Sequence, residues 1–185
     1  MKIASWNVNS LKVRLPQVLD WINLNQPDVL CLQETKQNND NFPHDVFKKI
    51  GLFSYHNGQN TYNGVAIISN KELIDVQFDI PNFYDEQKRL ISGIYPNDED
   101  PKFRVISAYI PNGQSLNSDK FEYKMNWIKS FISFLQTKID GIENIITGDF
   151  NIAPTTLDCY DSKSWDGKIL VSPQEREYFD KLLNL

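Results

Sequence analysis

The chain has 185 residues, of which 41% are hydrophobic and 23% charged, with a formal net charge of −5. This is the composition of a globular protein that is long enough to bury the core of one domain. No apolar stretch approaches the roughly 20 residues that span a bilayer. The acidic balance argues against broad, sequence-independent binding to nucleic acid, but it leaves room for an enzyme whose basic groups line a single groove.

The cysteines and the N-terminal residues predict a compartment. Cys31 and Cys159 are far apart and have no partner at metal-binding or redox spacing, and Cys31 lies within an apolar run typical of a reduced core thiol. The first residues contain no apolar segment followed by a small-residue cleavage site. We therefore expect a cytoplasmic protein.

The pattern of the first third of the chain predicts a strand, a helix and a second strand. Apolar residues at helical spacing follow a strand-like segment, and Gln26-Pro27 ends the helical pattern. Pro16 is expected in the first turn, where proline is tolerated. The expected elements are a strand over Lys2–Val8, a helix carrying Leu15, Val18, Leu19 and Ile22, and a buried strand over Asp28–Gln33. This order predicts a βαβ-like opening.

The middle of the chain is rich in short strands separated by turn residues, which is typical of a meander. A short helix is expected over Asp45–Ile50. The expected strands are Phe53–His56, Val65–Ser69, Ile74–Phe78, Leu90–Tyr95 and Arg104–Ile110.

The last third contains two expected helices around one strand. Ser118 or Asp119 is positioned to cap a long amphipathic helix that runs to about Ile139. The apolar run after it ends in Gly148-Asp149-Phe150-Asn151 and predicts a strand. Ser172-Pro173-Gln174-Glu175 then predicts a helix start with proline in the first turn.

Four of the apolar strands end in a polar side chain: Asn7, Glu34, Tyr109 and Asp149. Since a strand directs residues i and i+2 to the same face, Asp149 and Asn151 are expected to point the same way. Each residue alone is better explained as a turn former, a helix cap or a solvated strand end. If the four ends cluster, their oxygen ligands favour Mg²⁺ or Mn²⁺ over Zn²⁺ and suit a phosphoryl-transfer site.

The motifs together resemble the exonuclease III family of apurinic/apyrimidinic endonucleases, in the wider endonuclease/exonuclease/phosphatase fold. The similarity covers essentially the whole chain in order and spacing. The matching segments are Ser5-Trp6-Asn7-Val8-Asn9-Ser10-Leu11 with Arg14, Gln26-Pro27-Asp28-Val29, Leu32-Gln33-Glu34-Thr35-Lys36, Tyr62-Asn63-Gly64-Val65-Ala66, Gln87-Lys88-Arg89, Tyr109-Ile110-Pro111-Asn112-Gly113 and Gly148-Asp149-Phe150-Asn151-Ile152-Ala153-Pro154.

The resemblance implies a Mg²⁺-dependent DNA-repair hydrolase, with Mn²⁺ as a substitute, that cuts 5′ to abasic sites and has 3′–5′ exonuclease and 3′-phosphatase activity. Its expected partner is double-stranded DNA with abasic sites or 3′ ends, and the full-length form is expected to be a monomer. The implied catalytic residues are Tyr109, Asp149 and Asn151, and the implied metal ligands are Glu34, Asn7, Asp149 and Asn151. Arg89, Asn112 and Lys120 are the implied contacts to the DNA backbone.

The resemblance also implies an α/β fold, a four-layer sandwich of two packed mixed sheets with outer helices. Domains of this family run to roughly 250 residues, a size typical of large single domains. We therefore expect residues 1–185 to be the N-terminal portion of one such domain, with the C-terminal strands that carry an Asp general acid and an Asp–His pair missing. This expectation predicts a chain of low stability and impaired turnover.

Two other functions fit the same motifs. One is a non-catalytic remnant that binds metal or DNA. The other is a phosphatase of the same fold that acts on inositol phosphates or lipids. The Gln-Glu-Thr-Lys and Tyr-x-Pro-Asn-Gly segments favour the DNA branch over the second alternative.

Overall fold

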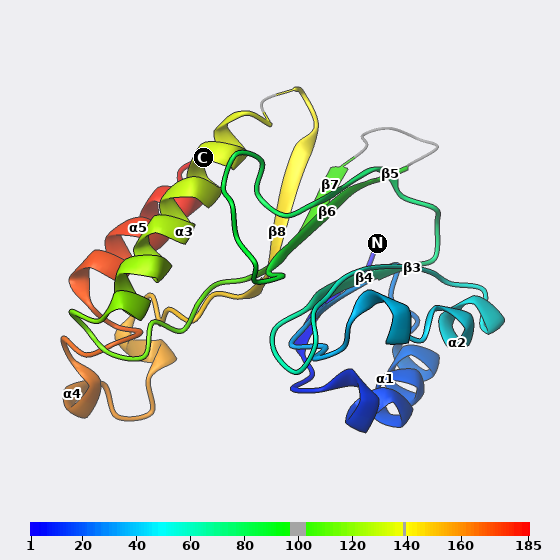
Figure 1. Ribbon diagram of the computed structural model, residues 1–185, viewed down its shortest axis with the longest axis horizontal. Helices are drawn as coiled ribbons and strands as arrows, with labels where there is room; N and C mark the ends of the chain where they lie inside the picture. The colour runs from blue at the N-terminus through cyan, green and yellow to red at the C-terminus, as the bar shows by residue number, and fades with distance from the viewer. Residues whose placement is uncertain (97–102, 139) are drawn as a thin grey trace. The chain divides into compact units, whose positions relative to one another are not determined.

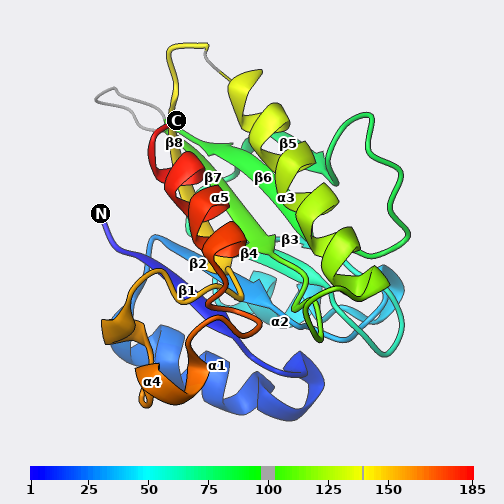
Figure 2. The ribbon, with the colours of Figure 1, turned by 90° about the vertical axis from the view of Figure 1, so that its left-hand side faces the viewer.

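The computed structural model describes residues 1–96, 103–138 and 140–185, and it divides the chain into two compact units. The first unit contains Met1–Tyr109 and Gly141–Asp149, and the second contains Ile110–Asp140 and Phe150–Leu185. Each unit is described by itself. Figures 1 and 2 together label the helices and strands along the chain.

All the strands of the described residues belong to the first unit and form two four-stranded mixed sheets (Figure 1). One sheet has the order β1-β2-β4-β3 and the other the order β5-β6-β7-β8. In each sheet one pair is parallel, β1 with β2 and β7 with β8, and the other pairs are antiparallel. The strands are β1 (Ile3–Asn7), β2 (Val29–Gln33), β3 (Phe53–Asn57), β4 (Val65–Ser69), β5 (Ile74–Phe78), β6 (Leu90–Tyr95), β7 (Phe103–Tyr109) and β8 (Glu143–Asp149).

The two sheets pack face to face, and the alternation of side chains along β2 shows how. All five residues of β2 are buried. Val29 and Cys31 contact the core between the sheets, whereas Leu30 and Leu32 belong to a second core on the opposite face. Gln33 Nε2 donates to Ser107 Oγ of β7 across 3.1 Å, so even the polar residue of this strand is satisfied within the core.

The second core lies between the β1-β2-β4-β3 sheet and two helices, α1 (Leu11–Asn25) and α2 (His44–Lys49). The buried helical residues of this layer are Leu11, Val18 and Ile22 of α1 and Phe47 of α2. The expectation for Pro16 was wrong, because α1 begins at Leu11 and places Pro16 in the second turn. Its missing N–H therefore removes one bond within the helix.

The second unit is built on two helices, α3 (Asp119–Gln136) and α5 (Pro173–Leu183), which lie side by side in Figures 1 and 2. Ser118 caps α3 by accepting from the Phe121 N–H, and Ser172 with Glu175 forms a capping box at α5. The expected end of α3 at Ile139 lies outside the described residues. The short elements are η1 (Asn39–Asn41), η2 (Thr156–Asp158) and α4 (Ser162–Trp165).

The α/β class, the two packed mixed sheets and the βαβ opening are thus confirmed. The free Cys31 thiol is buried as expected. Within the described residues, no helix combines the length and the apolar character needed to cross a bilayer.

Candidate active site

The site forms because two parallel strand pairs end at the same place in the first unit. In one sheet β1 runs parallel to β2, and in the other β7 runs parallel to β8, so the carboxyl ends of each pair lie together. The sheets stack with β1 and β2 against β8 and β7. This stacking brings Asn7, Glu34, Tyr109 and Asp149 into one cluster, which confirms the expectation that the four strand ends converge.

Asn7 connects the two carboxylates of this cluster. Its Nδ2 donates to Glu34 Oε1 at 2.9 Å and to Asp149 Oδ2 at 2.8 Å. The Tyr109 hydroxyl donates to the same Glu34 Oε1 at 2.9 Å. Two carboxylates from different sheets are therefore held close together by neutral donors.

Burial and hydrogen bonding act in opposite directions on Glu34. Burial alone would raise its pKa, but the donors Asn7, Lys36 and Tyr109 outweigh it and hold the pKa below the usual range. Burial and the hydrogen bond to Glu34 raise the pKa of Tyr109 well above its ordinary value. Glu34 is thus an anion at neutral pH, and the phenol is a protonated donor.

The backbone of the loops around the cluster is locally strained. Asn9, Ser10, Glu34 and Lys36 all have positive φ, with Glu34 at 54°. The loops hold one another, since the Ser10 N–H donates to the Glu34 carbonyl at 2.7 Å. Left-handed conformations at residues other than glycine cost free energy and concentrate at functional sites.

Lys36 is a site residue that the motif contained but that was not among the candidate residues. Its Nζ lies 3.0 Å from Glu34 Oε2 and also donates to Asn9 Oδ1. The sequence signal for Lys36 is its position two residues after Glu34, in the loop that follows β2. It places one positive charge at the edge of the carboxylate pair.

Arg89, expected to contact DNA, is only 8% exposed and lies against Tyr109. Its guanidinium carbon is 4.7 Å from the centre of the Tyr109 ring, and its Nη1 donates to the Tyr109 carbonyl at 3.2 Å. Gln87 Oε1 accepts from Nε at 3.1 Å and from Nη2 at 2.6 Å. These contacts hold Tyr109, while the role of Arg89 toward DNA stays a prediction.

The remaining candidates lie in the second unit. The Asn112 Nδ2 donates to Asn151 Oδ1 at 3.2 Å, and Lys120 is exposed in the first turn of α3. The strand argument for Asn151 was wrong, because β8 ends at Asp149 and Asn151 has a φ of 48°. Its Nδ2 donates to the Ile110 carbonyl at 2.9 Å. The role of Asn151 as a ligand or catalytic group stays a prediction.

The donors of the first unit fit a hard divalent cation. The described residues contain no group of three or more His, Cys, Asp or Glu that could hold a metal ion. However, Mg²⁺ keeps several waters and needs only one or two carboxylates. Glu34 and Asp149 supply two carboxylates joined through one amide, with no sulfur or imidazole in the cluster. This set suits Mg²⁺ or Mn²⁺ and does not suit Zn²⁺.

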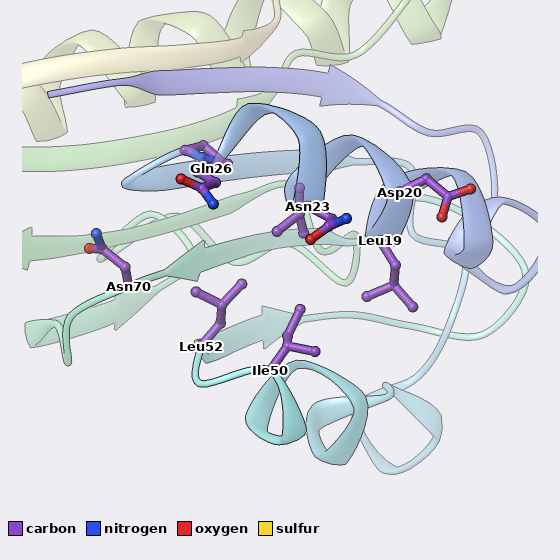
Figure 3. Close-up of a pocket in the computed structure, with 9 residues that line it drawn as sticks. Leu19, Asp20, Asn23, Gln26, Ile50, Leu52 and Asn70 are labelled. Carbon is purple, nitrogen blue, oxygen red and sulfur yellow. The ribbon is translucent and has the colours of Figure 1, made fainter.

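A separate hollow of about 490 Å³ lies between α1 and the loops that follow α2 and β4 (Figure 3). Leu19, Ile50 and Leu52 supply its apolar lining, and Gln26 and Asn70 part of its polar lining. It shares no residue with the carboxylate cluster. We assign the chemistry to the cluster, whose four side chains are half-buried and joined by hydrogen bonds.

The chain is similar to known proteins over nearly all of its length. Residues 4–174 match the Endonuclease/Exonuclease/phosphatase family. Exodeoxyribonuclease III of Haemophilus influenzae is 32% identical, over 98% of this chain and 71% of the relative. The chain therefore belongs to the endonuclease/exonuclease/phosphatase family, in the group of exodeoxyribonuclease III and AP endonuclease hydrolases.

Two solved structures share the fold over 100% of this chain and 70% of their own length. The 3′ phosphatase NExo from Neisseria, bound to a product DNA hairpin, has a TM-score of 0.94 and 42% identity. An AP endonuclease from Archaeoglobus fulgidus has a TM-score of 0.91 and 33% identity. Both likenesses agree with the two mixed sheets described above.

Proposed function

We propose that this chain hydrolyses phosphodiester bonds of double-stranded DNA, 5′ to abasic sites and at 3′ ends, with Mg²⁺ as cofactor and Mn²⁺ as a substitute. The observation that carries the proposal is the convergence of Asn7, Glu34, Tyr109 and Asp149 through three hydrogen bonds. The named activities of the relatives, an exonuclease, a 3′ phosphatase and an AP endonuclease, support the same substrate class.

In this proposal Glu34 and Asp149 would hold the cation, and Asn7 orients both carboxylates. A bound Mg²⁺ would polarise the phosphoryl group and offset its developing charge. Asp149 accepts the proton of the attacking water, because a positioned carboxylate beside that water is a plausible base. Tyr109, kept protonated by its environment, would exchange its hydrogen bond to Glu34 for one to a phosphate oxygen. In the second unit, we propose that the carboxamides of Asn112 and Asn151 donate to a phosphate of the DNA.

The Neisseria relative described as a 3′ phosphatase makes cleavage at 3′ termini the second activity to test. The cytoplasmic location and the monomeric state stay predictions.

The test is nicking of a labelled duplex that carries one abasic-site analogue, with Mg²⁺ or with EDTA. A second duplex with a 3′-phosphate and an inositol phosphate serve as comparison substrates. Asp149→Ala and Glu34→Gln are the site variants, and Asp20→Asn, an exposed acidic residue on α1, is the matched control.

We expect Mg²⁺-dependent cleavage of one or both DNA substrates that is lost in the site variants and kept in the control. Binding of the duplex without cleavage, from folded protein, would support the non-catalytic alternative. Release of phosphate from the inositol phosphate alone would overturn the DNA assignment.

A further inference from the structure

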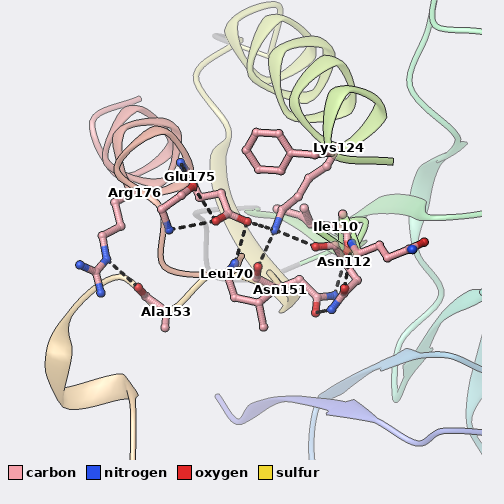
Figure 4. A network of polar contacts seen from close by, with 12 residues as sticks. Ile110, Asn112, Lys124, Asn151, Ala153, Leu170, Glu175 and Arg176 are labelled. Atoms are coloured by element: carbon pink, nitrogen blue, oxygen red, sulfur yellow. Dashed lines mark hydrogen bonds and ion pairs between the residues drawn. The ribbon is translucent and has the colours of Figure 1, made fainter. Parts of the chain in front are cut away.

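Lys124 and Glu175 form a fully buried ion pair within the second unit, and each side chain has 0% exposure. Lys124 comes from α3 and Glu175 from the first turn of α5. The Lys124 Nζ lies 2.5 Å from Glu175 Oε1, 2.7 Å from the Asn151 carbonyl and 3.3 Å from the Asn112 carbonyl (Figure 4). One ammonium thus contacts the backbone of both carboxamide residues.

The Glu175 carboxylate also accepts several hydrogen bonds besides the one from Lys124. Its Oε1 also accepts from the Leu170 N–H at 3.1 Å, and its Oε2 accepts from the Ser172 N–H at 3.0 Å and the Ser172 hydroxyl at 2.7 Å. The next residue of α5, Arg176, donates from Nε to the Ala153 carbonyl at 3.1 Å (Figure 4). The segment from Asn151 to Ala153 is therefore fixed at two points, by Lys124 of α3 at Asn151 and by Arg176 of α5 at Ala153.

Stability alone explains this pair poorly. Taking two charges out of water is costly, and replacing a buried pair by apolar side chains of similar volume is often neutral or stabilising. A buried pair is better explained when it specifies a geometry. Here the geometry is that of two carbonyls, which two of the three donors of one ammonium hold at a fixed separation while the third donates to Glu175.

The local backbone needs such support. Asn151 has a φ of 48°, which is unfavourable for a residue with a side chain. Gly113, next to Asn112, has a φ of +88°, and an added Cβ would lie 3.0 Å from Lys124 Cδ. The Lys124 stem therefore packs against the turn of the Tyr-x-Pro-Asn-Gly segment while its ammonium bonds to it.

We infer that Lys124 and Glu175 are positioning residues that hold the carboxamides of Asn112 and Asn151 in the arrangement that receives a DNA phosphate. The inference rests on the proposed function, since it assigns the two carboxamides to phosphate. Lys124 acts only through the backbone of these residues and does not touch the substrate.

The test combines NMR of the side-chain carboxamides with kinetics. Lys124→Met removes the ammonium and keeps the stem, and Glu175→Gln keeps an acceptor but removes the charge. Lys181→Met, the same substitution in an exposed ion pair of α5, is the matched control. Each variant is also made in an Asn112→Ala/Asn151→Ala background, and turnover is measured on the DNA duplexes described above.

We expect Lys124→Met to shift or broaden the Asn112 and Asn151 carboxamide signals and to lower kcat by about 10²-fold. In the double-alanine background its further effect should stay within about threefold, because the groups it positions are already gone. If Lys124→Met does not fold, Glu175→Gln should show the same signals perturbed and a smaller loss of kcat. Lys181→Met should change neither.

Unchanged carboxamide signals in the folded variants would overturn the inference. An equal loss of kcat in both backgrounds would also overturn it, since this would be a general effect on the fold. If the double-alanine protein itself turns over normally, the assignment of the carboxamides to phosphate fails, and the functional part of the inference fails with it.

Discussion

The guanidinium of Arg89 lies on the ring of Tyr109, 4.7 Å from its centre, and also donates to the carbonyl of the same residue. The Tyr109 N–H in turn donates to the Arg89 carbonyl at 2.8 Å. A planar cation held by Gln87 on one edge can stack and donate at once, which an ammonium cannot do.

Arg89→Lys should therefore lower kcat by about tenfold to 10²-fold with little change in KM, because it keeps the charge but releases the Tyr109 ring. Steady-state kinetics on the abasic duplex measure kcat and KM of the variant. The control is Lys71→Gln, because the wild-type Lys71 ammonium also lies over an aromatic ring, 5.8 Å from the centre of Tyr95. A rise in KM at constant kcat would instead indicate that Arg89 binds the DNA backbone directly.

Tyr109→Phe should change the pH dependence of activity. The Tyr109 hydroxyl is one of three donors that hold the pKa of Glu34 low against the effect of burial. Its loss raises that pKa, so Glu34 becomes protonated at a higher pH than in the wild type. The acid limb of the kcat/KM profile should move to higher pH, and an unmoved limb would show that Glu34 does not control it.

Mg²⁺ should stabilise the folded protein through Glu34 and Asp149. A ligand that binds only the native state contributes about 2.7 kcal/mol at 100 times its Kd. Thermal unfolding with and without Mg²⁺ should show a higher Tm with the ion, and Glu34→Gln should remove most of the shift. Asp20→Asn should retain it, and an equal shift in Glu34→Gln would place the ion elsewhere.

Gly148→Ala should destabilise the protein by about 3 kcal/mol or more, because overpacking against backbone leaves no room for relaxation. Gly148 has a φ of +148°, and an added Cβ would lie 1.9 Å from the Ala108 carbonyl oxygen of β7. Gly167→Ala is the control, with a φ of +68° and open space around its Cβ, and should cost only about 1 kcal/mol. Urea unfolding measures the loss of unfolding free energy in each variant. Equal losses would show that the positive φ, and not the contact with Ala108, determines the effect.

His56 should make stability depend on pH. Burial lowers its pKa from 6.5 to about 3, with a smaller effect from His44, and the ring stacks on Phe42 at 4.1 Å. The unfolded state therefore binds a proton that the native state does not. The stabilisation is complete above pH 6.5 and is lost as the pH falls toward 3, at about 1.4 kcal/mol per pH unit.

The difference between His56→Gln and the wild type isolates this contribution. The slope of unfolding free energy against pH should be shallower in the variant below pH 6.5. His44→Gln, at an exposed position in α2, should keep most of the wild-type slope. Parallel slopes for His56→Gln and the wild type would contradict the prediction.

Much of the fold followed from local patterns. The strand at β2 was predicted because a run of four apolar residues follows Pro27-Asp28. The start of α5 was predicted because Ser172 and Glu175 have capping-box spacing and Pro173 stands at the first helical position. The convergence of Asn7, Glu34, Tyr109 and Asp149 was predicted because polar residues ended four strands. These signals are local, and the packing of two sheets brings them together.

What the sequence could not show depends on contacts distant along the chain. Lys124 and Glu175 are separated by 51 residues, and nothing in either helix pattern marks them as partners. Asn151 was misjudged because strand alternation was extended past the end of β8, where the backbone turns to positive φ. Pro16 was misplaced because the helix start at Leu11 lacks a side-chain cap.

Glu34 follows a strand of one sheet and Asp149 ends a strand of the other, so the apolar layer between the sheets sets how far apart they stand. Mn²⁺ and Ca²⁺ are larger than Mg²⁺ and need longer bonds to oxygen. A change in the volume of Cys31 or Val105, both buried in that layer, would therefore retune which ion fits best. For the proposed cation site, ionic selectivity would then follow from the thickness of the hydrophobic core.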